Sequence, residues 1–303
     1  MTYPQLPFVF GPDISVWQDD NSTAQMVDFG VMRQAGATFV GIKVSQSTWI
    51  DQDFVYNWNN ARLKGIPRKA YHFLDWDKTG KEQARTFYGA LKNDPPELLA
   101  VCDYEKRSNA PGRSKMLDTL YDFMEEQKRL FDLLDRRPKD GIYTGISFWK
   151  EFGSTDSYWT RYVLWLAFYS TMVPVAPKPW PQWTFWQWGT PAWGLKFGAE
   201  SKDIDMNYFH GDLAAFNAFF GLAPQDEPPA PVVQDEILRV AVGSLNLRSQ
   251  PGTLRTTITG QLFQDSQVTL LERQQMGADT WAKVRVEGWM AEKYRGQEYL
   301  KDA

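Results

Sequence analysis

Residues 98–105 read LLAVCDYE, an apolar run that ends in two acidic side chains. Five consecutive apolar residues before Asp103 are typical of a strand that is buried on both faces. Because alternate residues of a strand point to the same face, Asp103 and Glu105 would project together, with Cα atoms about 6.6 to 6.8 Å apart. This stretch therefore predicts a buried strand that delivers two carboxyl groups to one place.

The rest of the first 222 residues alternates β-branched or aromatic runs with longer amphipathic ones. Further strands are expected at 39–45, 68–73, 141–144, 163–169, 184–188 and 204–208, and helices at 53–64, 80–92 and 114–137. Such alternation is typical of a parallel sheet covered by helices, and at this length a closed barrel is the economical arrangement. Helical signal is weak in the later repeats. We therefore expect an α/β fold, an irregular (β/α) barrel of the TIM type.

A proline-rich acidic stretch, APQDEPPAPVVQDE, follows at 223–236. Its four prolines and four acidic residues, without a basic one, favour an extended and solvated linker. Residues 237–303 carry short alternating runs between glycine and proline, which is typical of a small all-β barrel. The sequence thus predicts a barrel at 1–222, a linker at 223–236 and an SH3-like all-β module at 237–303.

The composition argues against several classes of function. One cysteine and two histidines among 303 residues argue against a thiolate or histidine metal site, and no cofactor is expected. A formal net charge of −4 lacks the excess of basic residues that is typical of nucleic-acid-binding proteins. The longest apolar run, at 162–169, is far shorter than a membrane span, and the first residues lack the pattern of a signal peptide. We expect a monomer that does not insert into membranes.

Two carboxyl groups at the end of a barrel strand suit acid and base chemistry, since active sites lie at the carboxyl ends of barrel strands. In glycosidic cleavage one carboxyl group protonates the leaving oxygen while the other stabilises positive charge on the sugar. Repulsion between close carboxylates keeps a proton on one of them to higher pH. Glu105 lies nearer the mouth and is the expected acid. On this pattern alone, two solvated loop acids are the alternative.

Nine short motifs resemble, in the same order, those of the glycoside hydrolase family 25 lysozymes. They are PDISVWQ (12–18), FVGIKVSQS (39–47), DFVYNWNNARLKGIP (53–67), YHF (71–73), DYE (103–105), IYTG (142–145), LWLAFYS (164–170), FWQWG (185–189) and DMNYFHGD (205–212). Together they cover essentially the whole first part of the chain.

The resemblance implies an N-acetylmuramidase, which cleaves the β-1,4 bond between N-acetylmuramic acid and N-acetylglucosamine in bacterial peptidoglycan. It implies four catalytic acidic residues: Asp13, Asp103, Glu105 as the acid, and Asp205. The course of the reaction stays open, because Cα spacing does not fix the separation of carboxyl groups. A water molecule could attack with inversion, or the substrate's 2-acetamido oxygen could attack while Asp103 or Asp205 stabilises the acetamido nitrogen.

Aromatic residues within the matched motifs are candidate platforms for the apolar faces of sugar rings. The expected substrate contacts are Tyr71, Tyr143, Tyr169 and Trp186 as platforms, Gln187 and Asn207 as hydrogen-bonding neighbours, and Lys43 among the carboxylates. The alternative is that these rings fill the barrel core, as Trp and Tyr often do. His72 and Cys102 each precede or follow a candidate residue in a strand, so both should face away from the mouth.

Residues 237–303 resemble a bacterial SH3 (SH3b) domain through SLNLRSQPG (244–252), WAKVRV (281–286) and GWMAEKY (288–294). The resemblance implies a module that holds the enzyme on its expected partner, the peptidoglycan of the cell wall. Such an arrangement is that of a phage endolysin held in the host cytoplasm until release, or of a secreted protein whose signal peptide was trimmed. Two alternatives are a non-catalytic wall-binding protein and a chitinase-like hydrolase, although Leu98 and Val101 replace two acidic residues of the chitinase strand motif.

Overall fold

The computed structural model describes residues 6–19, 23, 25–223, 237–249, 251, 258–276, 279–286, 293–294 and 297–298. The chain divides into two compact units, Met1–Pro224 and Gln225–Ala303. Of the linker expected at 223–236, all but residue 223 lies outside the described residues.

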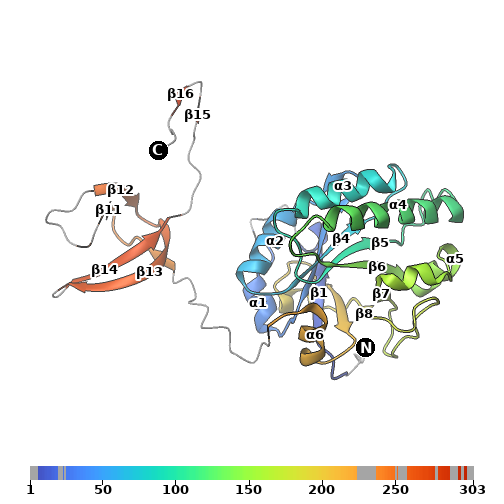
Figure 1. The fold of residues 1–303 in the computed structure, drawn as a ribbon. Helices are drawn as coiled ribbons and strands as arrows, with labels where there is room; N and C mark the ends of the chain where they lie inside the picture. The colour runs from blue at the N-terminus through green and yellow to red at the C-terminus, as the bar shows by residue number, and fades with distance from the viewer. Residues whose placement is uncertain are drawn as a thin grey trace. The chain divides into compact units, whose positions relative to one another are not determined.

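Eight strands of the first unit close into a barrel (Figure 1). They are β1 (Phe10–Ile14), β2 (Val40–Gln46), β4 (Arg68–Phe73), β5 (Leu99–Asp103), β6 (Lys139–Gly145), β7 (Val163–Ala167), β8 (Phe185–Gly189) and β9 (Asp205–Phe209), and they pair in this order, with β9 returning to β1. The first seven are parallel, whereas β9 is antiparallel to both neighbours. The short strand β3 (Trp49–Ile50) forms a hairpin with β2. The predicted irregular α/β barrel is confirmed.

Strand β1 escaped the periodicity argument because Gly11 and Pro12 interrupt its apolar pattern. Gly11 is required there, since a Cβ atom at this position would lie 1.9 Å from the carbonyl oxygen of Phe39. The close approach of the backbone brings β1 against the start of β2 and completes the barrel.

The described residues of the first unit form six α-helices: α1 (Phe29–Gln34), α2 (Phe54–Leu63), α3 (Gly80–Leu91), α4 (Arg113–Phe131), α5 (Ile146–Phe152) and α6 (Leu213–Phe220). Helix α3 begins with a capping box, in which Thr79 and Glu82 satisfy each other's backbone N–H groups. The helix predicted at 114–137 ends earlier, at Phe131, because residues 132–138 turn back to reach β6. Residues 168–184 between β7 and β8 contain no helix, which is the irregularity expected of the later repeats.

Alternation along the strands produces two apolar layers, one between strands and helices and one inside the barrel. Inside, the ring of Phe216 from α6 stacks on Phe39, 5.7 Å between centroids, and packs edge-on against Phe209. Phe39 precedes β2 and Phe209 ends the antiparallel β9, so both lie at the amino-terminal end of the parallel strands. Helix α6 therefore closes that end, and the barrel opens at the carboxyl ends.

The described residues of the second unit form strands and connecting loops, without a helix. Strands β10 (Ile237–Arg239), β13 (Gln267–Met276) and β14 (Asp279–Arg285) form an antiparallel sheet, β11 (Ser244–Arg248) pairs with β12 (Ile258–Phe263), and β15 (Lys293–Tyr294) pairs with β16 (Gln297–Glu298). Most of the motif at 288–294 lies outside the described residues. None of the described helices has the length and apolar character needed to cross a bilayer.

Candidate active site

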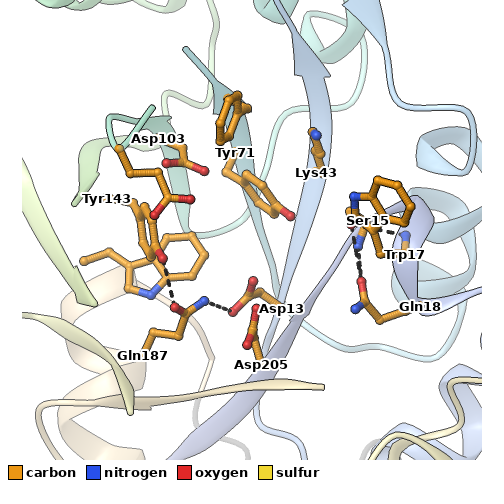
Figure 2. A pocket seen from close by; sticks show the side chains of 13 residues that line it. Asp13, Ser15, Trp17, Gln18, Lys43, Tyr71, Asp103, Tyr143, Gln187 and Asp205 are labelled. Atoms are coloured by element: carbon orange, nitrogen blue, oxygen red, sulfur yellow. Dashed lines mark hydrogen bonds between the residues drawn. The ribbon is translucent and has the colours of Figure 1, made fainter. Parts of the chain in front are cut away.

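A pocket of about 290 Å³ lies at the carboxyl ends of the parallel strands (Figure 2). All eight strands of the barrel, together with the segments after β1 and β5, supply side chains to its wall. The lining residues are Asp13, Ser15, Trp17, Gln18, Lys43, Tyr71, Phe73, Asp103, Glu105, Tyr143, Trp165, Gln187 and Asp205.

All four acidic residues expected at the site line this pocket. Asp103 ends β5 and Glu105 follows two residues later, whereas Tyr104 points the other way and donates a hydrogen bond to the carbonyl of the last residue of α5. Asp205 is the first residue of β9. Because β9 is antiparallel, its beginning lies at the carboxyl ends of the other strands, where Asp205 pairs in register with Asp13.

Asp13 is held by two amide side chains. Its Oδ2 accepts hydrogen bonds from Nε2 of Gln187 at 3.0 Å and from Nδ2 of Asn207 at 2.8 Å. The hydroxyl of Tyr143 donates to Oε1 of Gln187 at 2.8 Å, and Nε1 of Trp165 donates to Oδ1 of Asn207 at 2.7 Å. Since each amide oxygen already accepts a hydrogen bond, both amides turn their NH₂ groups to Asp13. Two of these contacts are visible in Figure 2, and together they favour the carboxylate form.

Burial makes the acidic residues of the pocket weaker acids. It raises the pKa of Asp103 well above 3.8, and the neighbouring charge of Glu105 raises it further. Burial and the charge of Asp13 raise the pKa of Glu105. The pKa of Asp205 rises to about 7 through burial and the charge of Asp13. Asp103 is 5% exposed whereas Glu105 is open to solvent, so desolvation acts more strongly on Asp103 than on the residue that the sequence pattern favoured as acid.

Lys43 projects from β2 into the same pocket. Its Nζ donates a hydrogen bond to Oε1 of Gln46 at 3.1 Å. Burial lowers the pKa of Lys43, and the charges of Asp51 and Asp103 raise it. The lysine therefore lies among the carboxylates, where it partly offsets their charge.

The three tyrosines expected as sugar platforms occupy different places. Tyr71 and Tyr143 line the pocket, and the hydroxyl of Tyr71 donates to the carbonyl of Ile14 at 3.2 Å. Tyr169 is 59% exposed and does not belong to the lining, but its hydroxyl donates to Oδ1 of Asp205 at 3.3 Å. Tyr71 and Tyr143 thus form the floor, and Tyr169 stands beside the rim.

The prediction that Trp186 lies in the cleft is wrong. Its side chain is 0% exposed, packs against Trp183 and donates from Nε1 to the carbonyl of Phe168. Neighbouring residues of a strand face opposite sides, and Gln187 faces the barrel interior, so Trp186 must face the helix layer. Asn207 also does not line the pocket, because it is fully buried beneath Asp13.

Sequence reasoning passed over three other residues. Trp17 lines the pocket and is 78% exposed, on a short 3₁₀ turn that Ser15 caps. Trp165 lines the pocket from β7, and Lys69 lies on β4 beneath Asp13. Trp17 and Trp165 stand within quoted motifs, and Lys69 is two residues before Tyr71. Strand alternation from Tyr71 would have placed Lys69 on the inner face.

His72 and Cys102 face away from the pocket. His72 binds the hydroxyl of Ser45 through Nδ1 at 2.8 Å and Oε1 of Gln83 through Nε2 at 3.0 Å, and Cys102 is buried in the layer beneath the helices. Both face outward as predicted. Within the part of the chain that the structure describes, no group of three or more His, Cys, Asp or Glu side chains is arranged to hold a metal ion.

Comparisons with known proteins agree with this geometry. The family model of the glycosyl hydrolases family 25 matches residues 12–192. Lysozyme M1 of Streptomyces globisporus is 30% identical over 218 residues, which are 68% of this chain and 69% of that protein.

Solved structures extend the comparison to the fold. A bacterial lysozyme from Streptomyces coelicolor is 27% identical with a TM-score of 0.57, over 70% of this chain and 96% of that one. A family GH25 lysozyme from Aspergillus fumigatus is 26% identical with a TM-score of 0.55, over 71% of this chain and 99% of that one. Because the family match spans more than half of the sequence and contains three of the four pocket carboxylates, the chain belongs to the glycosyl hydrolases family 25 and is a glycoside hydrolase.

Proposed function

We propose that this protein is an N-acetylmuramidase that cleaves the β-1,4 bond between N-acetylmuramic acid and N-acetylglucosamine in bacterial peptidoglycan. The observation that carries the proposal is the meeting of four carboxyl groups, from β1, β5, the segment after β5 and β9, in one pocket of a family 25 chain. The relatives named as lysozymes support the same substrate class.

Glu105 is the proposed general acid. It is partly exposed at the pocket wall, where the leaving glycosidic oxygen can reach it. Desolvation at the pocket wall and the negative charge of Asp13 raise the pKa of Glu105, and both effects favour its protonated form. Glu105 then donates this proton to the oxygen as the bond to the sugar breaks.

Asp103 is the proposed partner carboxylate. Its Oδ1 is buried and has no hydrogen-bond partner among the described residues, so a donor on the substrate would satisfy it. An acetamido N–H of the sugar is such a donor. Its binding would favour the anionic form of Asp103 and leave the proton shared by the pair on Glu105. Asp205 faces the same space and can orient the acetamido group or a water molecule.

The sugar rings have aromatic partners in and beside the pocket. Tyr71 and Tyr143 form its floor, and the exposed indole of Trp17 stands at its wall. Trp17 and Tyr169 are the exposed aromatic residues that a glycan chain would meet first. We expect them to contribute to binding rather than to bond cleavage.

The second unit is the proposed wall anchor. An SH3b-type module at 237–303 would raise the local concentration of the barrel on the wall, since a tethered second contact multiplies weak binding. The same reasoning proposes retention in the host cytoplasm until release, or secretion with removal of a signal peptide. Deletion of residues 224–303 should leave hydrolysis of soluble glycan unchanged and weaken lysis of whole cells.

The test is digestion of purified peptidoglycan, followed by borohydride reduction and mass spectrometry of the fragments. Cleavage at the proposed bond yields reduced N-acetylmuramic acid at every new end, whereas cleavage at the other glycosidic bond yields reduced N-acetylglucosamine. Glu105→Gln should abolish release while wall pull-down persists. Asp203→Asn, at an exposed acid outside the pocket, is the matched control and should retain activity. Release from chitin alone, or ends carrying reduced N-acetylglucosamine, would contradict the proposal.

A further inference from the structure

Asp13, Gly41 and Lys69 stand in one row across the barrel wall. Asp13 of β1 pairs in register with Gly41 of β2, and Gly41 pairs with Lys69 of β4. A Cβ atom added to Gly41 would lie 2.8 Å from Cβ of Asp13 and 2.8 Å from Cε of Lys69. The carboxylate and the ammonium side chain therefore approach each other over a strand position that has no side chain of its own.

Lys69 has unusual surroundings for a cation. It is 0% exposed, and its Nζ has no hydrogen-bond partner among the described residues. The Nζ lies 3.1 Å from the ring centroid of Trp165 and 4.6 Å from that of Phe185. Aromatic faces attract a cation but do not replace its hydration, so a buried ammonium here costs free energy that an apolar side chain would not.

The charge of Asp13 influences the other acidic residues of the pocket, and Lys69 influences Asp13. Asp13 raises the pKa of Asp103, Glu105 and Asp205, so its own charge is felt by every other acid of the pocket. The phenols that face the same carboxylate are Tyr71, Tyr143 and Tyr169. Burial raises the pKa of Asp13, whereas Lys69, Asn207 and Gln187 lower it. Burial lowers the pKa of Lys69 well below 10.5, and the charge of Asp13 raises it. Lys43, the lysine that lines the pocket, acts on Asp103.

We propose that Lys69 is a positioning residue that keeps Asp13 ionised, so that the proton held in the pocket stays on Asp103 and Glu105. The two locked amides orient Asp13 and donate to its carboxylate, but they carry no net charge. Lys69 supplies the compensating charge from beneath, where neither solvent nor substrate reaches it. The use of the proton rests on the proposed function, but the charge on Asp13 can be measured without turnover.

The experiment follows the carboxyl ¹³C signal of Asp13 in the full-length protein as a function of pH, with the signal assigned through Asp13→Asn. Lys69→Met keeps the volume and removes the charge. We expect the titration midpoint of Asp13 to rise by about 1 pH unit or more. Leu99→Met, a size-conserving change at another buried position of the barrel interior, is the matched control and should leave the midpoint unchanged. An unchanged midpoint in Lys69→Met would overturn the proposal.

Two further measurements separate this role from packing. The acidic limb of the pH profile of wall hydrolysis should move upward by the same amount, and activity should recover above the new limb. Lys69→Met leaves the charge of Asp13 uncompensated, so its thermal stability should fall as pH rises and Asp13 ionises, whereas a packing defect alone would lower stability equally at all pH values. If the variant does not fold, ¹⁵N detection of Lys69 Nζ in the parent protein decides: an ammonium at pH 6 supports the proposal, and a neutral amine overturns it. Should the parent prove inactive on peptidoglycan, the proposed function fails while the Asp13 titration still tests Lys69.

Discussion

Two consecutive basic residues of β4, Arg68 and Lys69, are both fully buried, but their surroundings differ. Arg68 faces outward, where its Nη1 donates to Asp94 at 2.8 Å and its Nε donates to Glu97 at 2.9 Å. The guanidinium also stacks on the ring of Trp58, 4.1 Å from its centroid. Lys69 faces inward and has aromatic rings around its Nζ in place of hydrogen-bond acceptors.

The difference separates a structural charge from a functional one. A buried cation whose donors are satisfied by two carboxylates ties strand to loop, and its removal leaves those carboxylates without a partner. A buried cation with no acceptor adds nothing to stability through hydrogen bonds, so its presence needs another reason. For Lys69 the reason we infer is the charge of Asp13. Substitutions at and around the two positions can break or sharpen this contrast.

The largest loss of stability is expected from Arg68→Met. The change removes the hydrogen bonds to Asp94 and Glu97. The side chains of these two residues are 31% and 23% exposed, so water can replace the lost hydrogen bonds only in part. We expect a loss of about 3 kcal/mol in the free energy of unfolding, measured by urea denaturation. At a temperature where the variant stays folded, wall hydrolysis should be unchanged. A loss below about 1 kcal/mol would contradict the structural role.

The same substitution should change how stability depends on pH. Hydrogen bonding to Arg68 lowers the pKa of Asp94 from its ordinary value of 3.8. A carboxyl group with a lower pKa in the folded state contributes stability above its ordinary pKa and loses that contribution as pH falls. The parent protein should therefore lose stability between about pH 4 and pH 2 more steeply than Arg68→Met. Equal slopes in that range would mean that the pair does not carry the acid sensitivity.

The next effect in size concerns Gly41, which lies between the carboxylate and Lys69. In Gly41→Ala the new methyl group would meet both Asp13 and Lys69 at 2.8 Å, so one of the two side chains must move. A displacement of about 1 Å of a catalytic side chain lowers activity about 100-fold. The measurement is the rate of reducing-end release from purified peptidoglycan, with circular dichroism as the check on folding.

Gly89→Ala provides the matched control for that change. Gly89 lies within α3, and a Cβ atom there would meet nothing within 4 Å. The variant should keep full activity and gain up to about 1 kcal/mol in stability, because alanine is the better helix former. A comparable loss of activity in both glycine variants would show that the Gly41 effect is not local to the row.

The sequence pattern predicts most of the barrel strands and part of the site. Apolar, β-branched and aromatic runs predicted seven of the eight barrel strands. Strand alternation predicted that Asp103 and Glu105 project to the same face. Alternation applied at Trp186 and Lys69 would have placed the first outside the barrel and the second inside. Asp205 could not be found that way, because its place at the mouth depends on β9 running antiparallel to its neighbours.

The smallest expected effect tests whether burial, rather than pairing, sets the energy of these cations. Nη1 of Arg107 contacts Oε2 of Glu151 at 2.6 Å, but both side chains are about half exposed, at 51% and 54%. We expect Arg107→Ala to change the free energy of unfolding by less than about 1 kcal/mol, and the difference should shrink in high salt. A double-mutant cycle with Glu151→Ala isolates the pair from the stacking of Arg107 on Phe148. If this exposed pair contributed as much stability as Arg68, pairing with a carboxylate rather than burial would set the contribution. The distinction between Arg68 and Lys69 would then lose its physical basis.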